Sequence, residues 1–239
     1  MKLLDLNINC FGGTDAHREA FKAAYGPRYY LKAWDERDKS KEVRGILECI
    51  KRHSPDLVIL QEYDIHSHEA RFFERELRAN GYTLHSETPE SRRPSMTVFF
   101  VREATIPTHT YVSANHTRNG RAYGMKVGDI ILYGTHVPPH YDEQFWTELH
   151  QFVKEHLSEK YLLMGDFNTI NPKNRAQLNR LLEDAADLWR SKGHDAAISV
   201  MGDYAIASKA IDIQNVEIDS FDEGYSDHPV MLVSIQTTA

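Results

Sequence analysis

The chain has 239 residues, of which 41% are hydrophobic and 26% are charged, and its formal net charge is -7. This composition is typical of a globular protein with a sizeable core, and no apolar run reaches the roughly 20 residues that cross a bilayer, so we expect no membrane insertion. The negative charge disfavours strong non-specific attraction to nucleic acid, although it allows a locally basic cleft. We expect one domain over residues 1–239 and, because the N-terminus turns polar at Asp5, a cytoplasmic location.

Apolar runs and amphipathic stretches alternate along the chain, which predicts an α/β fold. The predicted helices span residues 16–25, 41–53, 67–80, 142–157 and 175–188. The predicted strands span residues 3–9, 56–62, 82–85, 97–101, 129–136, 203–206, 211–218 and 230–235, with a further buried strand that begins at Tyr161 and stops at Asp166. No internal repeat or linker divides this series.

Polar side chains stand at the ends of the most apolar predicted strands. They are Asn7, Glu62, His136, the pair Asp166 and Asn168, and the pair Asp227 and His228. Ligands of α/β sheets bind where strand ends converge, so we expect these side chains to meet at one edge. Carboxylates suit a hard divalent cation, amides bind phosphate oxygens and imidazoles move protons. The pattern therefore predicts Mg²⁺, with Mn²⁺ as a substitute, acting on a phosphoryl group beside a His-activated water.

Other catalytic signatures are missing from the sequence. There is no Walker phosphate loop, dinucleotide glycine fingerprint, HExxH zinc pair or GxSxG nucleophile. Arg118, Arg121 and Tyr123 flank a predicted turn and are the candidates for a basic, aromatic substrate-binding rim. Scattered solvated charge is the alternative interpretation of these three residues.

Six short motifs, taken together and in order, resemble the endonuclease/exonuclease/phosphatase superfamily, also called deoxyribonuclease I-like. The motifs are Leu6-Asn7-Ile8-Asn9, Gln61-Glu62, Thr135-His136, Gly165-Asp166-Phe167-Asn168, Asp203-Tyr204 and Ser226-Asp227-His228-Pro229. The resemblance implies a four-layer α/β sandwich, in which two mixed β-sheets pack face to face with helices on the outside. It also implies metal-dependent cleavage of phosphoester bonds.

The resemblance assigns a role to each matched residue. Glu62 is similar to the principal metal ligand, assisted by Asn7 and Asp227. His228 is similar to the general base and Asp203 to the carboxylate that orients its ring, although Asp166 is an alternative proton acceptor. Asp166 and Asn168 are expected to position the water and the scissile phosphate, and His136 to stabilise charge on the phosphoryl oxygens or the leaving group.

Two departures from the family pattern bear on substrate and site. Gly202 precedes Asp203 where inositol polyphosphate 5-phosphatases carry a Trp-Cys pair, which disfavours that group. No acidic residue or tyrosine near residues 95–97 is available to pair with His136.

The leading hypothesis is a divalent-metal-dependent nuclease or related phosphodiesterase with DNA or RNA as substrate. A phosphatase or phosphodiesterase acting on a small, inositol or lipid phosphoester is the second hypothesis, and the acidic charge gives it some support. A nucleic-acid-binding protein whose catalytic site has decayed is the third.

Overall fold

The computed structural model describes residues 1–26, 37–86, 96–112, 120–184, 202–208, 210–220 and 224–236. Its strands form two sheets. The first sheet has the order β10-β11-β1-β2-β4-β3 and contains β1 (Lys2–Asn7), β2 (Leu57–Tyr63), β3 (Tyr82–His85), β4 (Met96–Arg102), β10 (Ile213–Asp219) and β11 (Val230–Ile235). The second has the order β5-β6-β7-β8-β9 and contains β5 (Thr110–Val112), β6 (Ala122–Val127), β7 (Ile130–His136), β8 (Lys160–Asp166) and β9 (Asp203–Ala207).

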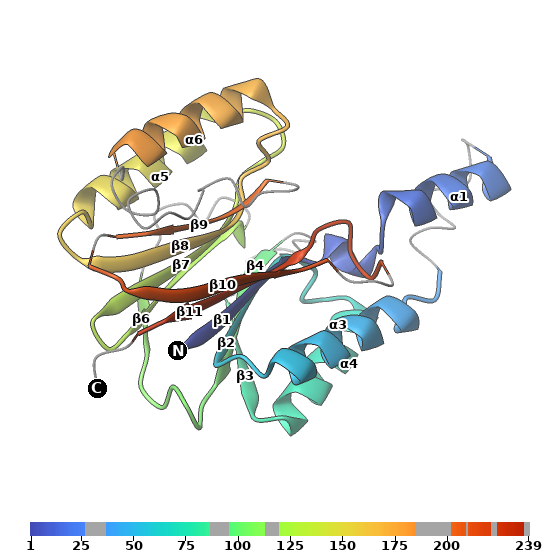
Figure 1. The fold of residues 1–239 in the computed structure, drawn as a ribbon. Coiled ribbons are helices and arrows are strands. Elements are labelled where there is room, and N and C mark those ends of the chain that lie inside the picture. Colours follow the sequence, from blue (N-terminus) through green and yellow to red (C-terminus); the bar gives the residue numbers. More distant parts are fainter. Residues whose placement is uncertain are drawn as a thin grey trace.

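Helices cover the outer faces of the two sheets (Figure 1). The helices of the described residues are α1 (Asp15–Tyr25), α3 (Ser40–His53), α4 (His68–Ala79), α5 (Glu143–Glu155), α6 (Pro172–Asp184) and the short 3-10 helix η1 (Asn9–Phe11). In Figure 1, α3 and α4 lie on the first sheet, α5 and α6 lie on the second, and α1 projects away from the body. No helix in the described part of the chain is long and apolar enough to span a membrane.

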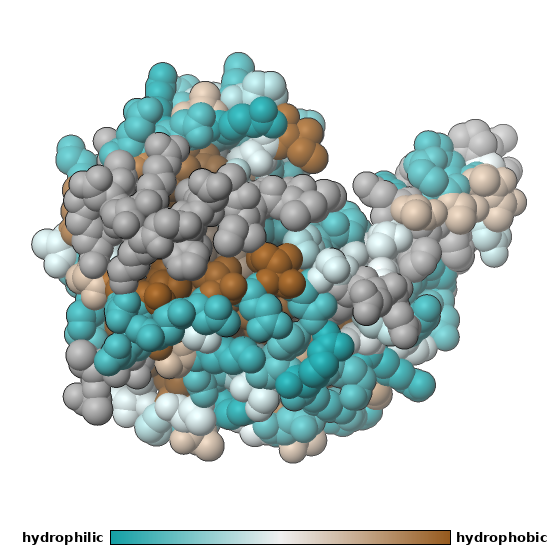
Figure 2. All heavy atoms as spheres, viewed as in Figure 1, coloured by the Kyte–Doolittle hydropathy of each residue, from teal (hydrophilic) through white to brown (hydrophobic). Residues whose placement is uncertain are grey.

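Three apolar layers hold this arrangement together. Val43, Ile46 and Ile50 on one face of α3 pack with Leu4 and Leu6 of β1 beneath the helices of the first sheet. A second layer fills the space between the sheets, and a third joins the second sheet to α5 and α6 around the buried Trp146. In Figure 2, hydrophobic side chains reach the surface as a band across the middle of the visible face. The four-layer α/β sandwich expected from the sequence is thus confirmed.

Strand direction brings the polar strand ends together. β1 and β2 are parallel, with Asn7 opposite Gln61, and β7 and β8 are parallel, with His136 opposite Asp166. The carboxyl ends of parallel neighbours lie at the same edge of a sheet. Each sheet therefore places polar residues from the ends of two neighbouring strands at one edge.

Two glycines are required where backbones approach closely. A Cβ on Gly134 of β7 would lie 2.6 Å from the Phe99 ring and 2.7 Å from Ile59, so this position lets the two sheets come together. Gly165, next to Asp166, has φ +143°, and a Cβ there would lie 1.8 Å from the backbone oxygen of Thr135. No side chain fits at Gly165 while β7 and β8 keep their register.

The structure differs from the predicted elements in four main places. β1 ends at Asn7, and Asn9, the last residue of the predicted strand 3–9, begins the 3-10 helix η1. Residues 122–127 form a strand, β6, where the sequence suggested the flank of a turn, and Thr110–Val112 form the short edge strand β5. Helix α6 begins at Pro172, three residues before the predicted start, while residues 185–188 of the predicted helix lie outside the described residues. Gly124 and Lys126 interrupt the apolar pattern of β6, and this hid the strand.

We expect Gly165→Ala to lower the free energy of unfolding by at least about 3 kcal/mol or to prevent folding, because the methyl group collides with backbone and not with a movable side chain. Gly128→Ala is the matched control. Gly128 also has a left-handed φ, +59°, but a Cβ there meets nothing within 4 Å, so its cost is only the conformational strain of about 1–2 kcal/mol. Urea unfolding of both variants measures the difference, and equal losses would show that the contact with Thr135 is unimportant.

Candidate active site

The predicted polar residues meet where the carboxyl ends of β1, β2, β7 and β8 face one another. Two of them sit on backbone in the left-handed region, Glu62 with φ +55° and Asn168 with φ +48°. Such conformations cost free energy and are concentrated at functional sites. Glu62 lies where the register between β2 and β4 shifts, and Asn168 lies two residues after the end of β8, so both irregular positions are where the side chains converge.

Asp166 occupies the centre of the site and is almost fully buried. Its Oδ2 accepts hydrogen bonds from Asn7 Nδ2 at 3.1 Å and Asn168 Nδ2 at 3.2 Å, and its Oδ1 accepts from the Asn168 backbone N–H at 2.7 Å. Asn7 Nδ2 also donates to Glu62 Oε1 at 3.2 Å. The Asn9 backbone N–H donates to Asn7 Oδ1 at 2.9 Å, which fixes the orientation of the amide. In this geometry Asn7 holds two carboxylates together instead of offering its oxygen to a cation.

His228 and Asp203 form a directly hydrogen-bonded pair. His228 Nδ1 lies 2.8 Å from Asp203 Oδ2, and the other ring nitrogen, Nε2, lies 3.8 Å from Asp166 Oδ2. Burial opposes the charged imidazole, but the hydrogen bond and charge of Asp203, with the charges of Asp166 and Asp227, outweigh it and raise the pKa of His228. Burial and the charge of Asp203 raise the pKa of Asp166. The His228–Asp203 pair is therefore arranged to hold a proton on His228 Nε2, next to Asp166.

His136 faces the same point with a different partner. Arg121 Nη1 donates to His136 Nδ1 at 2.9 Å, because a guanidinium can only donate. His136 Nε2 then carries the ring proton and lies 3.6 Å from both Glu62 Oε1 and Asp166 Oδ2. Burial, Arg121 and His228 hold the pKa of His136 well below its usual value, so the ring is neutral. The partner of His136 Nδ1 is thus a cationic side chain, Arg121, in place of the acidic residue or tyrosine of the family pattern.

The donor set suits a hard divalent cation. Oxygen and nitrogen atoms of Asp166, Asp203 and His228 lie within 4.8 Å of one another, and the carboxylate of Glu62 is 28% exposed beside them. Asp203 Oδ1 is buried and has no hydrogen-bond partner among the described residues. Three carboxylates so close together leave negative charge that a cation would compensate. Glu62, Asp166 and Asp203 are thus the residues of this site that can hold a metal ion.

Sequence reasoning missed Ser226, which connects the two ends of the chain at the site. Its buried hydroxyl donates to the Asn7 carbonyl oxygen at 2.6 Å and accepts from the His228 backbone N–H at 3.2 Å. Only its position in the Ser226-Asp227-His228-Pro229 motif signalled it. This hydrogen bond sets the segment that carries His228 against the end of β1.

The remaining predicted residues lie in different surroundings. Asp227 is next to the site, where its Oδ1 lies 3.4 Å from Ser226 Oγ and its charge acts on His228. Tyr123 is 5% exposed, and its ring packs against Phe99 and Tyr111 in the core between the sheets, away from the solvent-facing rim predicted for it. Arg118 lies outside the described residues.

Several solved structures share this fold. An AP endonuclease from Archaeoglobus fulgidus has a TM-score of 0.64 at 13% identity, covering 99% of this chain and 100% of that chain. The 3' phosphatase NExo from Neisseria, bound to a product DNA hairpin, has 0.64 at 14%, with the same coverage. TDP2 from D. rerio, humanized by 14 mutations, has 0.60 at 14%, covering 99% of both chains.

Comparison with curated proteins gave no match. The sequence model of one family does match, and it covers residues 6–228, from the end of β1 to the histidine of the Asp203 pair. It has the description Endonuclease/Exonuclease/phosphatase family. This chain belongs to that family, as its six motifs indicated.

Proposed function

We propose that this protein is a divalent-metal-dependent phosphodiesterase that hydrolyses phosphodiester bonds of DNA or RNA. The observation that carries the proposal is the convergence on Asp166 of the Asp203–His228 pair, the neutral His136 and the partly exposed Glu62. One group can move a proton, one can donate a hydrogen bond to an oxyanion, and one can hold a cation. These are the three functions that hydrolysis of a phosphoester requires.

Each side chain has a role in this mechanism. A bound Mg²⁺ or Mn²⁺ supplies charge stabilisation at the phosphoryl oxygens. The carboxylates that raise the pKa of His228 are those that a cation would neutralise, so in the metal-loaded site Nε2 would be able to accept the proton of the attacking water. Asp203 holds Nδ1–H and stabilises the charged ring. His136 donates Nε2–H to a phosphoryl or leaving-group oxygen. Asn7 and Asn168 act through Asp166, since their amides already bind it, so they are positioning residues.

The named neighbours favour nucleic acid as substrate. One is an AP endonuclease, one is a 3' phosphatase with a product DNA hairpin, and TDP2 from D. rerio was also solved with a single strand DNA product. The formal charge of -7 is the observation that favours the second candidate, a phosphatase or phosphodiesterase for small phosphoesters, because such substrates need no extended basic surface.

The proposal is tested by cleavage of supercoiled plasmid and of labelled single-stranded RNA in Mg²⁺ and in Mn²⁺. We expect cleavage that a chelator abolishes and that Glu62→Gln reduces at least about 100-fold. Glu159→Gln is the matched control, since Glu159 precedes β8 at the end away from the site and its side chain is 41% exposed. If folded wild-type protein cleaves neither polymer but releases phosphate from small esters, the second candidate replaces the first.

We expect His228→Ala and Asp203→Asn each to lower kcat by about 10³–10⁴, and the double variant to lose little more than either alone. The reason is that Asp203 Oδ2 orients the His228 ring and stabilises its charge, so removing either partner disables the same proton acceptor. Single-turnover rates of the three variants measure this coupling, with circular dichroism as the check on folding. A wild-type rate for His228→Ala would assign proton transfer to Asp166, and additive losses would give Asp203 a separate role.

Arg121→Met should lower kcat about 100-fold with little change in KM, because His136 then loses the donor that fixes its proton on Nε2. In a His136→Ala background the same change should have little further effect. If Arg121 instead contacts a nucleic acid backbone directly, the variant raises KM. The slope of log binding constant against log salt concentration then falls by about the contribution of one phosphate contact. Steady-state kinetics at several salt concentrations distinguish these two roles.

A further inference from the structure

A second group of metal-binding side chains lies outside the candidate active site. His85 ends β3, Glu103 follows β4, and His109 precedes β5, and one ligand atom of each lies within 4.8 Å of the others. β4 begins at Met96, which pairs with Tyr63 next to Glu62, so Glu103 follows the end of β4 that points away from the active site. The group is thus separate from the catalytic residues.

The contacts within this group bring two imidazoles and a carboxylate together. His85 Nε2 lies 3.3 Å from Glu103 Oε1, and the rings of His85 and His109 meet edge to face with centroids 4.4 Å apart. Burial and the neighbouring His109 lower the pKa of His85, against the opposing effect of Glu103. A neutral imidazole offers a lone pair to a metal ion, whereas a charged one does not.

His109 provides an independent observation. Its Nδ1 is buried and has no hydrogen-bond partner among the described residues. Buried polar atoms of native proteins nearly always have a hydrogen-bond partner, so a buried atom without one needs an explanation. A cation shared with His85 and Glu103 would supply that explanation.

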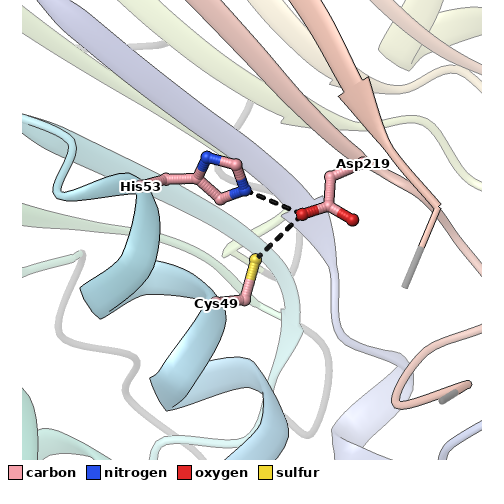
Figure 3. Close-up of side chains that lie close together, drawn as sticks. All are labelled: Cys49, His53 and Asp219. Atoms are coloured by element: carbon pink, nitrogen blue, oxygen red, sulfur yellow. Dashed lines mark hydrogen bonds and ion pairs between the residues drawn. The ribbon is translucent and has the colours of Figure 1, made fainter. Parts of the chain in front are cut away.

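A comparable group, formed by Cys49 and His53 on α3 and Asp219 on β10, is already compensated (Figure 3). His53 Nε2 lies 2.7 Å from Asp219 Oδ2, and Arg52 also donates to that oxygen and forms an ion pair with it. Burial and the charge of Asp219 raise the pKa of Cys49 to about 12, so its sulfur is a thiol. The Asp219 carboxylate therefore already has a cationic partner, Arg52. The group of Cys49, His53 and Asp219 serves below as the control for metal binding by His85, Glu103 and His109.

We propose that His85, Glu103 and His109 bind a divalent transition-metal ion of the zinc type. Two imidazole nitrogens and one carboxylate oxygen are ligands that Zn²⁺ accepts and that Mg²⁺ rarely does, and three protein ligands leave one position for water. β3 is an edge strand of the first sheet and β5 an edge strand of the second, and between Glu103 and His109 the buried Ile106 packs in the inter-sheet core. The metal joins the two sheet edges at this point.

The test is the amount of zinc that the full-length protein retains after dialysis with excess Mg²⁺, which competes at the active site. His109→Ala should retain one equivalent less than wild type, while His53→Ala and Glu62→Gln should retain that equivalent. Glu103→Gln changes a side chain that is 41% exposed, so the protein should fold, and its zinc affinity should fall at least tenfold. Circular dichroism without metal checks the fold of each variant.

Two further measurements locate the ion. Zinc at about 100 times its Kd should raise the Tm of wild type by roughly 5–10 °C and leave that of His109→Ala unchanged. The Co²⁺ form should absorb in the visible without a sulfur-to-metal charge-transfer band, since no thiolate is a ligand. The proposal is overturned if wild type and His109→Ala retain equal zinc, if Glu103→Gln keeps wild-type affinity, or if His53→Ala loses the ion and Co²⁺ gives the sulfur band.

Discussion

The site depends on the burial of two carboxylates side by side. Asp166 and Asp203 lie opposite each other on the antiparallel strands β8 and β9, and both are nearly inaccessible to solvent. Like charges in a poorly solvated interior repel strongly unless other groups compensate them. His228 and the amides of Asn7 and Asn168 provide that compensation here. The carboxylates that raise the pKa of His228 are the groups that a cation would neutralise, so a bound cation would lower the pKa of this imidazole.

The sequence revealed the strand ends and their polar residues because the runs before them are strongly apolar. It also supported the sandwich, since six motifs in order resemble one family. It could not show that His136 is paired with Arg121, because that contact depends on β6, whose pattern Gly124 and Lys126 interrupt. The antiparallel pairing of Ala122 with Thr135 is what brings Arg121 to the imidazole. Tyr123 was misjudged for the same reason, since a residue in a central strand is buried and one beside a turn is exposed.

A second polar pair lies beneath the site and escaped the sequence reasoning entirely. Asp5 is in β1, on the face that also carries Leu3 and Asn7, and Gln61 Nε2 donates to its Oδ1 at 2.7 Å. Burial, with the charges of Asp203 and Asp166, raises the pKa of Asp5 well above its usual value, which favours the neutral acid. A neutral acid adds no further negative charge below Asp166 and Asp203. A single acidic residue, Asp5, within an apolar run gave no indication of this role beneath the site.

The hydrogen bond from Ser226 to the Asn7 carbonyl spans 219 positions of sequence. The first strand and the segment before the last strand therefore hold complementary parts of one candidate active site, and β11 pairs directly with β1. During synthesis on the ribosome, a growing chain has Glu62 and Asp166 long before it has His228. The site is therefore complete only after the last strand has left the exit tunnel and docked, so incomplete products of translation lack the Asp203–His228 pair.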